Sequence, residues 1–326
     1  MTWVNTLTGP NTTTFQMPTI QVQPVGFALG ARVTGVDLSK MLTSDEVQQI
    51  KAAWTKHLVL VFPGQQLDPA TLTAFTTHFG ELDNYDSQPF NRHPEHDHVM
   101  LLSNKPVNGK LPAGAYNGQN WHTDLSYTVR PAKATMVYCI EKPSVGGDTM
   151  FANMYAAYEA LSPKMREFLD DLEAVNDVSL ISARRDPAIL EAFKRLNPPV
   201  VHPAVRIHPE SGKPALYVND RVRTFVGMSD LESKPIIKFL CEHSVQPRFV
   251  YRHRWEVRDL VLWDNRCLTH LAVGDYDPKE IRHMIRTSTM GDHYGRLENP
   301  QAAEASLKAA AATSQEVAAG VSALHD

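Results

Sequence analysis

Short apolar runs that end at glycine, proline or asparagine recur along the chain, a pattern typical of β-strands. They predict strands at 20–24, 31–36, 58–62, 135–140, 200–207, 215–219, 248–255 and 260–263. The run at 58–62 is apolar at every position and stops at Pro63 and Gly64. A run of this kind predicts a buried strand rather than one with a solvated face.

Three stretches carry helical signals between these strands. Ser44 is the expected N-cap of the first helix, because acidic residues follow it in the first turn. Asp68-Pro69 begins a second predicted helix, which Gly80 ends, and a third is expected over 229–243. The predicted fold class is therefore mainly β with flanking helices (α+β).

Two irregular stretches and two unusual ends divide the chain. The stretch 83–120 is rich in Asn, Asp, His, Pro and Gly, and a segment of this length inside a compact domain is typical of a functional lid. A second insertion is predicted near 177–199. Residues 1–19 predict a flexible N-terminal arm, and 297–326 an Ala-rich, helix-prone tail. We expect a single domain over 20–296 that carries both insertions.

Composition limits the classes of binding partner and the cellular compartment that we expect for this protein. A chain of 326 residues with 43% hydrophobic residues can form one β-rich domain with insertions. The formal charge of -4 gives no reason to expect nucleic acid or a membrane surface as partner. The sequence shows neither a membrane span nor a signal peptide, and its three cysteines form no CxxC motif. We expect a cytoplasmic protein; a homo-oligomer stays open.

One short segment carries metal-ligand chemistry. His122 and Asp124 are separated by one residue, so in an extended segment both side chains lie on the same face and can bind one metal ion. His270, in a distant segment that begins as an apolar strand, is the expected third ligand. Two imidazoles and one carboxylate form the facial arrangement of non-haem Fe(II) oxygenases. A core histidine bonded to a carboxylate would give the same spacing, so the motif alone does not decide.

Two further features favour a metal site with an anionic cosubstrate. Thr149 ends a Gly-Gly-Asp-Thr segment that follows the predicted strand 135–140. Arg282 and Arg286 are four residues apart on an expected strand, and therefore on one face. A guanidinium matches a carboxylate with two parallel hydrogen bonds, so a dicarboxylate would have an anchor here. A surface ion pair of Arg282 with Glu280 or Asp277 is the alternative.

Together these motifs resemble the Fe(II)- and 2-oxoglutarate-dependent dioxygenases of the TauD/TfdA type. The matching stretches are 121–124, 146–149, 208–213, 263–266 and 282–292, so the resemblance extends from about 22 to 292. It implies a double-stranded β-helix core, the jelly-roll architecture of cupins, which also suits the predicted strands.

The resemblance also implies roles for individual residues. His122, Asp124 and His270 would bind Fe(II) and serve as the catalytic centre. Thr149 and Arg282 would bind the distal carboxylate of 2-oxoglutarate. With O2, such an enzyme hydroxylates a C–H bond and releases succinate and CO2. Related halogenases have a small residue in place of the carboxylate ligand, so an aspartate at 124 favours hydroxylation.

The expected substrate is a small organic anion: a sulfonate, a sulfate ester, an aryloxyalkanoate or another carboxylate. Each presents oxygens to a guanidinium, so Arg286 would bind either this anion or the other end of 2-oxoglutarate. Taurine-specific members have His and Tyr shortly after Phe-Gly-Glu-Leu, where this chain has Tyr85 and Gln88. Tyr85 is predicted to stack on a flatter or larger anion, and Leu125 to supply an apolar wall.

Two other classes of protein remain as alternatives. A cupin-like metal-dependent hydrolase would use the same three ligands to activate water, but it would not need the arginine that a dicarboxylate requires. A non-catalytic small-molecule binder would keep the pocket and tolerate the loss of a ligand, yet all three ligands are present.

Overall fold

The structure, a computed structural model, describes residues 20–106, 109, 111–112, 118–181 and 187–304. The predicted N-terminal arm and most of the predicted C-terminal tail lie outside the described residues. Within them, no helix is long and apolar enough to cross a membrane.

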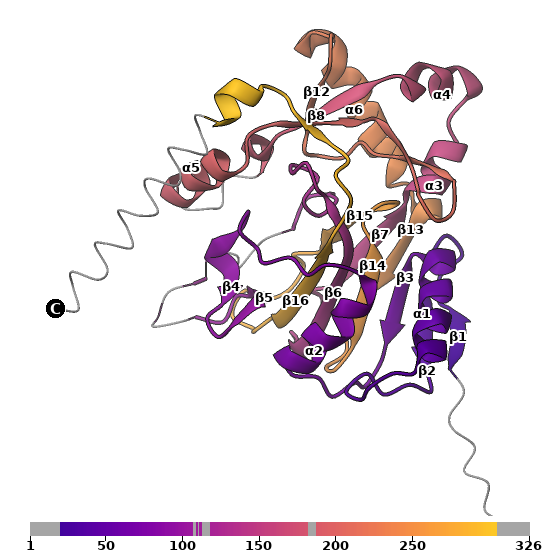
Figure 1. The fold of residues 1–326 in the computed structure, drawn as a ribbon, viewed down its shortest axis with the longest axis vertical. Helices are drawn as coiled ribbons and strands as arrows, with labels where there is room; N and C mark the ends of the chain where they lie inside the picture. The colour runs from indigo at the N-terminus through magenta and orange to yellow at the C-terminus, as the bar shows by residue number, and fades with distance from the viewer. Residues whose placement is uncertain (1–19, 107–108, 110, 113–117, 182–186, 305–326) are drawn as a thin grey trace, which may run out of the picture.

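A large sheet forms the base of the fold (Figure 1). Its eight strands, in spatial order, are β1 (Gln21–Pro24), β2 (Ala31–Thr34), β3 (Val59–Phe62), β14 (Leu260–Asp264), β6 (Ala132–Glu141), β16 (His283–Met290), β5 (His96–Ser103) and β4 (Arg92–His93). β2 and β3 are parallel, and the other neighbouring pairs are antiparallel.

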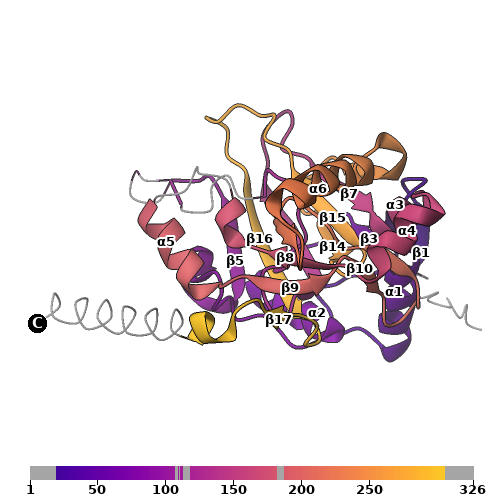
Figure 2. The ribbon, with the colours of Figure 1, turned by 90° about the horizontal axis from the view of Figure 1, so that it is seen from above.

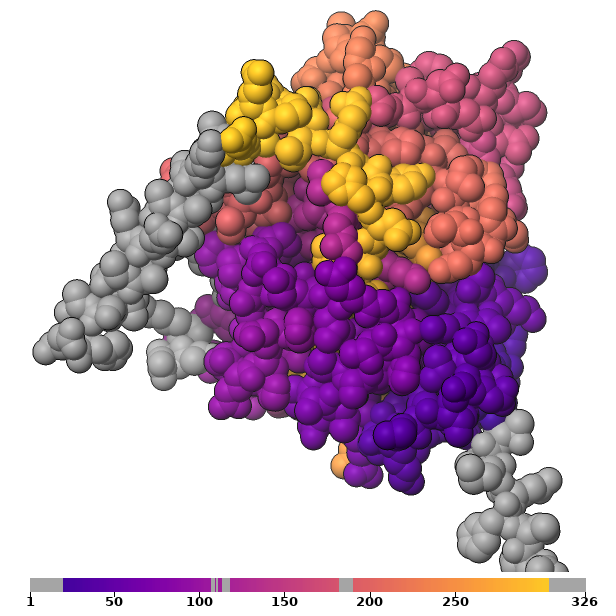
Figure 3. Space-filling model, in the orientation of Figure 1, coloured from indigo at the N-terminus to yellow at the C-terminus, as the bar shows by residue number. Residues whose placement is uncertain are grey.

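Smaller sheets pack against one face of the large sheet. One has the order β13 (Val250–His253), β7 (Thr149–Asn153) and β15 (Leu268–Ala272). Another has the order β12 (Val222–Phe225), β8 (Glu173–Asn176), β9 (Val200–Pro203) and β17 (Arg296–Leu297), and β10 (Val205–Ile207) pairs with β11 (Pro214–Leu216). Near the C-terminus of the described chain, β17 joins the edge of this second sheet, and the yellow segment crosses the face seen in Figure 3.

Helices lie on both sides of the sheets. They are α1 (Ser44–His57), α2 (Pro69–Thr76), α3 (Met154–Glu159), α4 (Pro163–Asp170), α5 (Pro187–Leu196) and α6 (Asp230–Ser244), with short 3-10 turns at Thr77–Phe79, Pro89–Asn91, Val178–Leu180 and Pro247–Phe249. α1 and α2 pack on the large sheet, and α6 lies on the opposite side (Figure 2). The predicted class, mainly β with flanking helices, is confirmed.

The central strands show why their sequences are apolar throughout. In β14, Leu260 and Leu262 join the cluster beneath α1 and α2, whereas Val261 and Trp263 join the core between the sheets. Successive side chains of a strand point to opposite faces, and both faces of this strand are covered. β3 follows the same rule, so the prediction of a buried strand at 58–62 is confirmed apart from Leu58.

The predicted cap of α1 is wrong by one residue. Thr43, not Ser44, is the N-cap: its hydroxyl oxygen accepts a hydrogen bond from the N–H of Glu46 at 3.2 Å. The carboxylate of Glu46 accepts from the N–H of Thr43 at 2.7 Å. This reciprocal pair of bonds needs a glutamate three residues after the cap, and only Thr43 has one.

The prediction of an irregular stretch at 83–120 is wrong for β5, which pairs with β16 in the large sheet. Val99 and Met100 are buried in β5, but the polar residues at its start gave no strand signal in the sequence.

The prediction of one strand at 200–207 is wrong as well. This stretch forms two strands in different sheets, because the first ends at Pro203, which has no N–H to continue the hydrogen bonding of the strand. Parts of both predicted lids lie outside the described residues, and the lid role stays a prediction.

Candidate metal centre and active site

A backbone bridge joins the two segments that carry the candidate ligands. The N–H of His122 donates to the carbonyl of His270 at 3.0 Å, and the N–H of His270 donates back at 2.8 Å. His270 belongs to β15, whereas His122 precedes β6 by ten residues. The bridge holds the two imidazole ring centroids 4.2 Å apart. Sequence positions 148 apart, 122 and 270, therefore meet as predicted.

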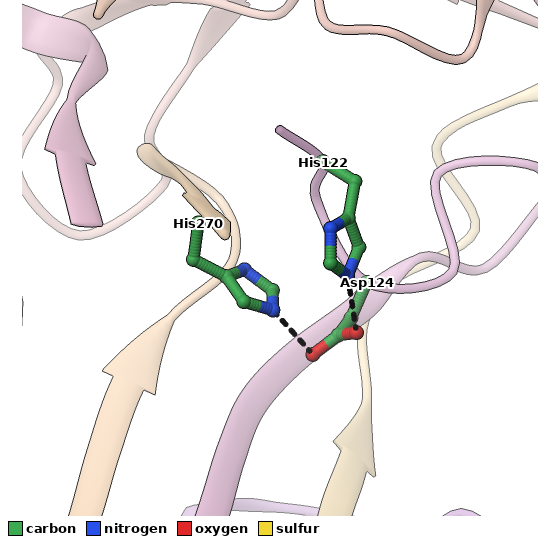
Figure 4. Close-up of side chains that lie close together, drawn as sticks. All are labelled: His122, Asp124 and His270. Carbon is green, nitrogen blue, oxygen red and sulfur yellow. Dashed lines mark ion pairs between the residues drawn. The ribbon is translucent and has the colours of Figure 1, made fainter. Parts of the chain in front are cut away.

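The carboxylate of Asp124 completes the group (Figure 4). Its Oδ1 lies 3.7 Å from Nε2 of His122, and its Oδ2 lies 3.8 Å from Nε2 of His270. Two ligands that each lie about 2.1 Å from one metal are separated by about 3 to 4 Å. All three side chains are buried. The donor set and its spacing fit a divalent transition metal.

Burial sets the protonation states that such a site needs. It lowers the pKa of His270 to about 4, and burial together with His270 and Arg221 lowers the pKa of His122 well below its usual value. Burial acts to raise the pKa of Asp124, but the charge of Arg286 outweighs it and holds that pKa below its usual range. Neutral imidazoles and an ionised carboxylate are the forms that bind metal.

Thr135 and Asn265, which the sequence reasoning did not single out, orient the carboxylate. The hydroxyl of Thr135 donates to Oδ2 of Asp124 at 2.9 Å and accepts from Nδ2 of Asn265 at 2.8 Å. Oδ1 of Asn265 accepts from the N–H of Asp124 at 3.3 Å. Nδ1 of His122 lies 2.7 Å from the carbonyl of Asn120, which turns Nε2 toward Asp124. The one sequence feature that could have indicated this role is that Asn265 lies within the matching stretch at 263–266.

Replacing Thr135 by valine should weaken metal binding by about 10- to 100-fold, because the variant keeps the shape of the side chain but loses the bond to Asp124. The measurement is a Mn(II) titration of the purified protein. Thr287→Val is the matched control, since Thr287 is also fully buried but bonds Thr76, at 2.7 Å between the hydroxyls. Equal Mn(II) affinities in the two variants would contradict a role for Thr135.

A second group of potential ligands does not suit a metal. His208, Asp264 and Cys267 also lie close together and are buried. Arg266 already donates to both oxygens of Asp264, at 2.8 and 2.6 Å, and Nε2 of His208 lies 3.1 Å from Oδ2. The carboxylate is thus engaged in a closed ion-pair network, which holds the turn between β14 and β15.

Arg286 faces the candidate metal centre from β16, as predicted. Its Nη1 donates to Oδ1 of Asp124 at 3.1 Å. Nε and Nη2 of the same guanidinium are buried and have no hydrogen-bond partner among the described residues. Two donors of a buried cation are therefore left for an anion.

Arg282 lies immediately before β16 and reaches the Gly-Gly-Asp-Thr segment. Its Nε donates to the carbonyl of Gly147 at 2.9 Å, and Thr149, at the start of β7, accepts from Nε1 of Trp255 at 3.0 Å. Burial lowers the pKa of Arg282. The alternative of a surface ion pair is wrong within the described residues, because neither Glu280 nor Asp277 forms an ion pair with Arg282. The carboxylate of Glu280 accepts from the hydroxyl of Ser144 at 2.8 Å, and that of Asp277 accepts from the N–H of Lys279 at 2.9 Å.

Tyr85 and Leu125 are both buried in the packing around the site. The hydroxyl of Tyr85 donates to the carbonyl of Arg286 at 3.2 Å, and the guanidinium of Arg286 lies 5.6 Å from the centre of its ring. Leu125 packs in a small cluster that includes Tyr127 and Phe193. Their predicted contacts with a substrate stay predictions, since the structure shows both side chains in contact with protein.

Known proteins are similar to this chain in sequence and in fold. The sequence model described as "Taurine catabolism dioxygenase TauD, TfdA family" matches residues 21–288. An alpha-ketoglutarate-dependent 2,4-dichlorophenoxyacetate dioxygenase from Cupriavidus pinatubonensis is 33% identical over 286 residues, which cover 84% of this chain and 98% of that protein. An alpha-ketoglutarate-dependent sulfate ester dioxygenase from Pseudomonas putida is 33% identical, with 81% and 88% covered.

A solved structure extends the likeness to three dimensions. The crystal structure of AAD-2 in complex with Mn(II) and N-oxalylglycine superimposes with a TM-score of 0.72 at 30% identity. The match covers 84% of this chain and 97% of that one. The predicted jelly-roll core is confirmed by this likeness.

Proposed function

Because the chain belongs to the taurine catabolism dioxygenase TauD, TfdA family and is a metal- and 2-oxoglutarate-dependent oxidoreductase, we propose that it uses Fe(II) and O2 to hydroxylate a small organic anion. The observation that carries this proposal is the buried cluster of His122, Asp124 and His270 beside the guanidinium of Arg286, two donors of which have no partner in the part of the chain that the structure describes. Neither a hydrolase nor a non-catalytic binder receives support from the relatives.

His122, Asp124 and His270 would hold the metal on one side and leave the opposite side for the cosubstrates. When bound, Fe(II) supplies the oxidative chemistry that couples 2-oxoglutarate decarboxylation to C–H hydroxylation. The chain's own part is to keep both imidazoles neutral, to fix the carboxylate through Thr135, and to exclude water from a buried site. The fit rests on the donor set and its spacing.

We place the distal carboxylate of 2-oxoglutarate on Arg282 and Thr149. Arg282→Lys keeps the charge but loses the planar fork, so the Michaelis constant for 2-oxoglutarate should rise by about 10-fold or more, as for the loss of a charged hydrogen bond. Thr149→Val should change it less, in the same direction. Steady-state kinetics with varied 2-oxoglutarate provides the measurement, and Arg254→Lys, an exposed site, serves as the control. Unchanged Michaelis constants for 2-oxoglutarate in both variants would show that other residues bind its distal carboxylate.

The substrate class follows from Arg286 and from the relatives. Those relatives are named for 2,4-dichlorophenoxyacetate and for sulfate esters, both of which carry anionic oxygens. Arg286 has donors for such oxygens, whereas the Tyr85 and Gln88 pair departs from the taurine-specific pattern. We therefore favour aryloxyalkanoates and sulfate esters over taurine.

Succinate release tests the proposal directly. The Fe(II)-loaded protein is incubated with 2-oxoglutarate, O2 and single members of a panel of aryloxyalkanoates, alkyl sulfates, sulfonates, aromatic carboxylates and amino acids. We expect succinate in equal amount to hydroxylated product for at least one organic anion. Turnover of neutral compounds alone would overturn the substrate class, and release of a hydrolysis product without succinate would overturn the reaction.

Three broader proposals accompany this function. We propose one dioxygenase domain over 20–296, with lids near 83–120 and 177–199. A cytoplasmic location is supported by three cysteines that are all unpaired in the structure. A homo-oligomer remains a proposal to be tested by the mass of the protein in solution.

A further inference from the structure

Trp255 contacts one of the two residues to which we assign the distal carboxylate of 2-oxoglutarate. Its indole Nε1 donates to the hydroxyl oxygen of Thr149 at 3.0 Å, and both side chains are buried. An indole N–H can only donate, so the hydroxyl of Thr149 is the acceptor in this bond. The proton of that hydroxyl therefore points away from the indole.

Strand pairing brings these two residues together. Thr149 begins β7, the middle strand of its sheet, and pairs with His253 of β13 on one side and with Ala272 of β15 on the other. Trp255 follows the end of β13 by two residues. The register of β13 against β7 thus places the indole beside the start of β7, where the Thr149 hydroxyl is.

Packing fixes the orientation of the indole. The Trp255 ring packs edge-on against the imidazole of His253, with the ring centroids 4.6 Å apart, and it belongs to the core between the sheets. In the turn that follows, the N–H of Glu256 donates to Oδ2 of Asp259 at 3.0 Å, and this oxygen lies 3.3 Å from Nε2 of His253. A close-packed ring keeps one rotamer, so its N–H keeps one direction.

The hydroxyl of Thr149 has its own proton left to donate. In the part of the chain that the structure describes, its one side-chain hydrogen bond is the bond that it accepts from Trp255. Arg282 lies close by, since its Nε donates at 2.9 Å to the carbonyl of Gly147, two residues before Thr149. A carboxylate held by the guanidinium of Arg282 would offer an acceptor to this proton, and a hydroxyl that already accepts one hydrogen bond is a stronger donor.

We propose that Trp255 is a positioning residue for the cosubstrate: its indole N–H orients the hydroxyl of Thr149 so that the hydroxyl donates to the distal carboxylate of 2-oxoglutarate. The proposal rests on the proposed function, since it requires that Thr149 binds this carboxylate. Trp255 acts through Thr149 and not by contact with the cosubstrate. The alternative is a purely structural bond, in which Thr149 only provides an acceptor for a buried indole.

Binding of N-oxalylglycine to the Mn(II)-loaded protein, measured by calorimetry, tests the proposal. This analogue has both carboxylates of 2-oxoglutarate. Trp255→Phe keeps an aromatic ring but loses the N–H, so N-oxalylglycine should bind about 3- to 10-fold more weakly, as for the loss of one neutral hydrogen bond, while the affinity for Mn(II) stays unchanged. Trp54→Phe is the matched control, because Trp54 is equally buried and its Nε1 has no hydrogen-bond partner among the described residues.

A double-mutant cycle assigns the effect to Thr149. In a Thr149→Val background, Trp255→Phe should change the affinity for N-oxalylglycine by less than about 2-fold, because the hydroxyl that the indole orients is already gone. In turnover, Trp255→Phe should raise the Michaelis constant for 2-oxoglutarate and leave kcat and the Michaelis constant for the prime substrate unchanged. Equal weakening in both backgrounds would overturn the proposal, since Trp255 would then act without Thr149.

Two results separate this proposal from the proposed function. If Arg282→Lys weakens N-oxalylglycine binding and Trp255→Phe does not, the role of Trp255 is wrong and the assignment of the carboxylate to Arg282 stands. If neither Arg282→Lys nor Thr149→Val changes the affinity, the distal carboxylate is bound by other residues and both are wrong. Should Trp255→Phe fail to fold, replacement of Trp255 by 3-benzothienylalanine, which has sulfur in place of the N–H, decides the matter by the same measurements.

Discussion

Replacing His122, Asp124 or His270 by alanine is expected to abolish succinate release and to remove stoichiometric metal from the purified protein. Each change deletes one of three ligands, and the two that remain cannot fix a facial site. Metal content by elemental analysis and succinate release in the presence of a turned-over anion are the two measurements. Exposed His293, replaced by alanine, is the control and should keep both properties.

The three variants should differ in stability. Asp124→Ala leaves the buried guanidinium of Arg286 without its ion-pair partner, which costs about 3 to 5 kcal/mol for a buried pair. Combining it with Arg286→Gln should recover part of that loss, because the unpaired charge is gone. Urea unfolding of the metal-free proteins measures the difference. Full turnover in any single variant would overturn the assignment of the ligands.

Asp124→Gly tests the reaction outcome as well as the ligand. The variant should lose hydroxylation because the carboxylate is gone, and halide is the anion that the opened position would admit. Mass spectrometry of the product in the presence of chloride distinguishes a hydroxylated from a chlorinated compound. Unimpaired hydroxylation by this variant would show that the carboxylate is not a ligand.

Replacing Arg286 by glutamine is expected to raise the Michaelis constant for the acidic prime substrate by about 10- to 100-fold. The physical reason is the loss of hydrogen bonds from a charged donor, about 1.5 to 3 kcal/mol. The constant for 2-oxoglutarate should stay nearly unchanged, because its distal carboxylate is assigned to Arg282. Steady-state kinetics with each compound varied in turn separates the two effects.

The opposite pattern would assign Arg286 differently. A raised constant for 2-oxoglutarate with an unchanged one for the prime substrate would place Arg286 at the metal-proximal end of the cosubstrate. A neutral substrate turned over equally well by the wild type and by Arg286→Gln would remove the organic-anion proposal and leave the dioxygenase chemistry. The Arg223→Gln protein serves as the control, since it loses the same charge at a partly exposed arginine that pairs with Asp177 and Glu298.

Local sequence patterns were sufficient to predict an element where the residues of that segment alone determine its structure. The buried strand β3, the helix that begins after Asp68 and the stop at Gly80 follow from apolar runs, caps and glycine geometry, although the α-helix itself ends at Thr76 and a 3-10 turn continues to Phe79. The alternation of His122 and Asp124 also follows from the period of an extended segment. By contrast, β5 was missed, since its place in the sheet depends on β16 as a partner rather than on its own polar first residues.

The sequence by itself determined the donor set, the pair of arginines and, through resemblance, the reaction class, because these depend on residue type and spacing. Only the tertiary structure decided that His122 and His270 are bridged, that Asn265 and Thr135 together fix the carboxylate of Asp124, and that Arg286 pairs with this carboxylate. Contacts between segments a hundred or more residues apart are set by strand pairing and side-chain packing. No local period in the sequence records them.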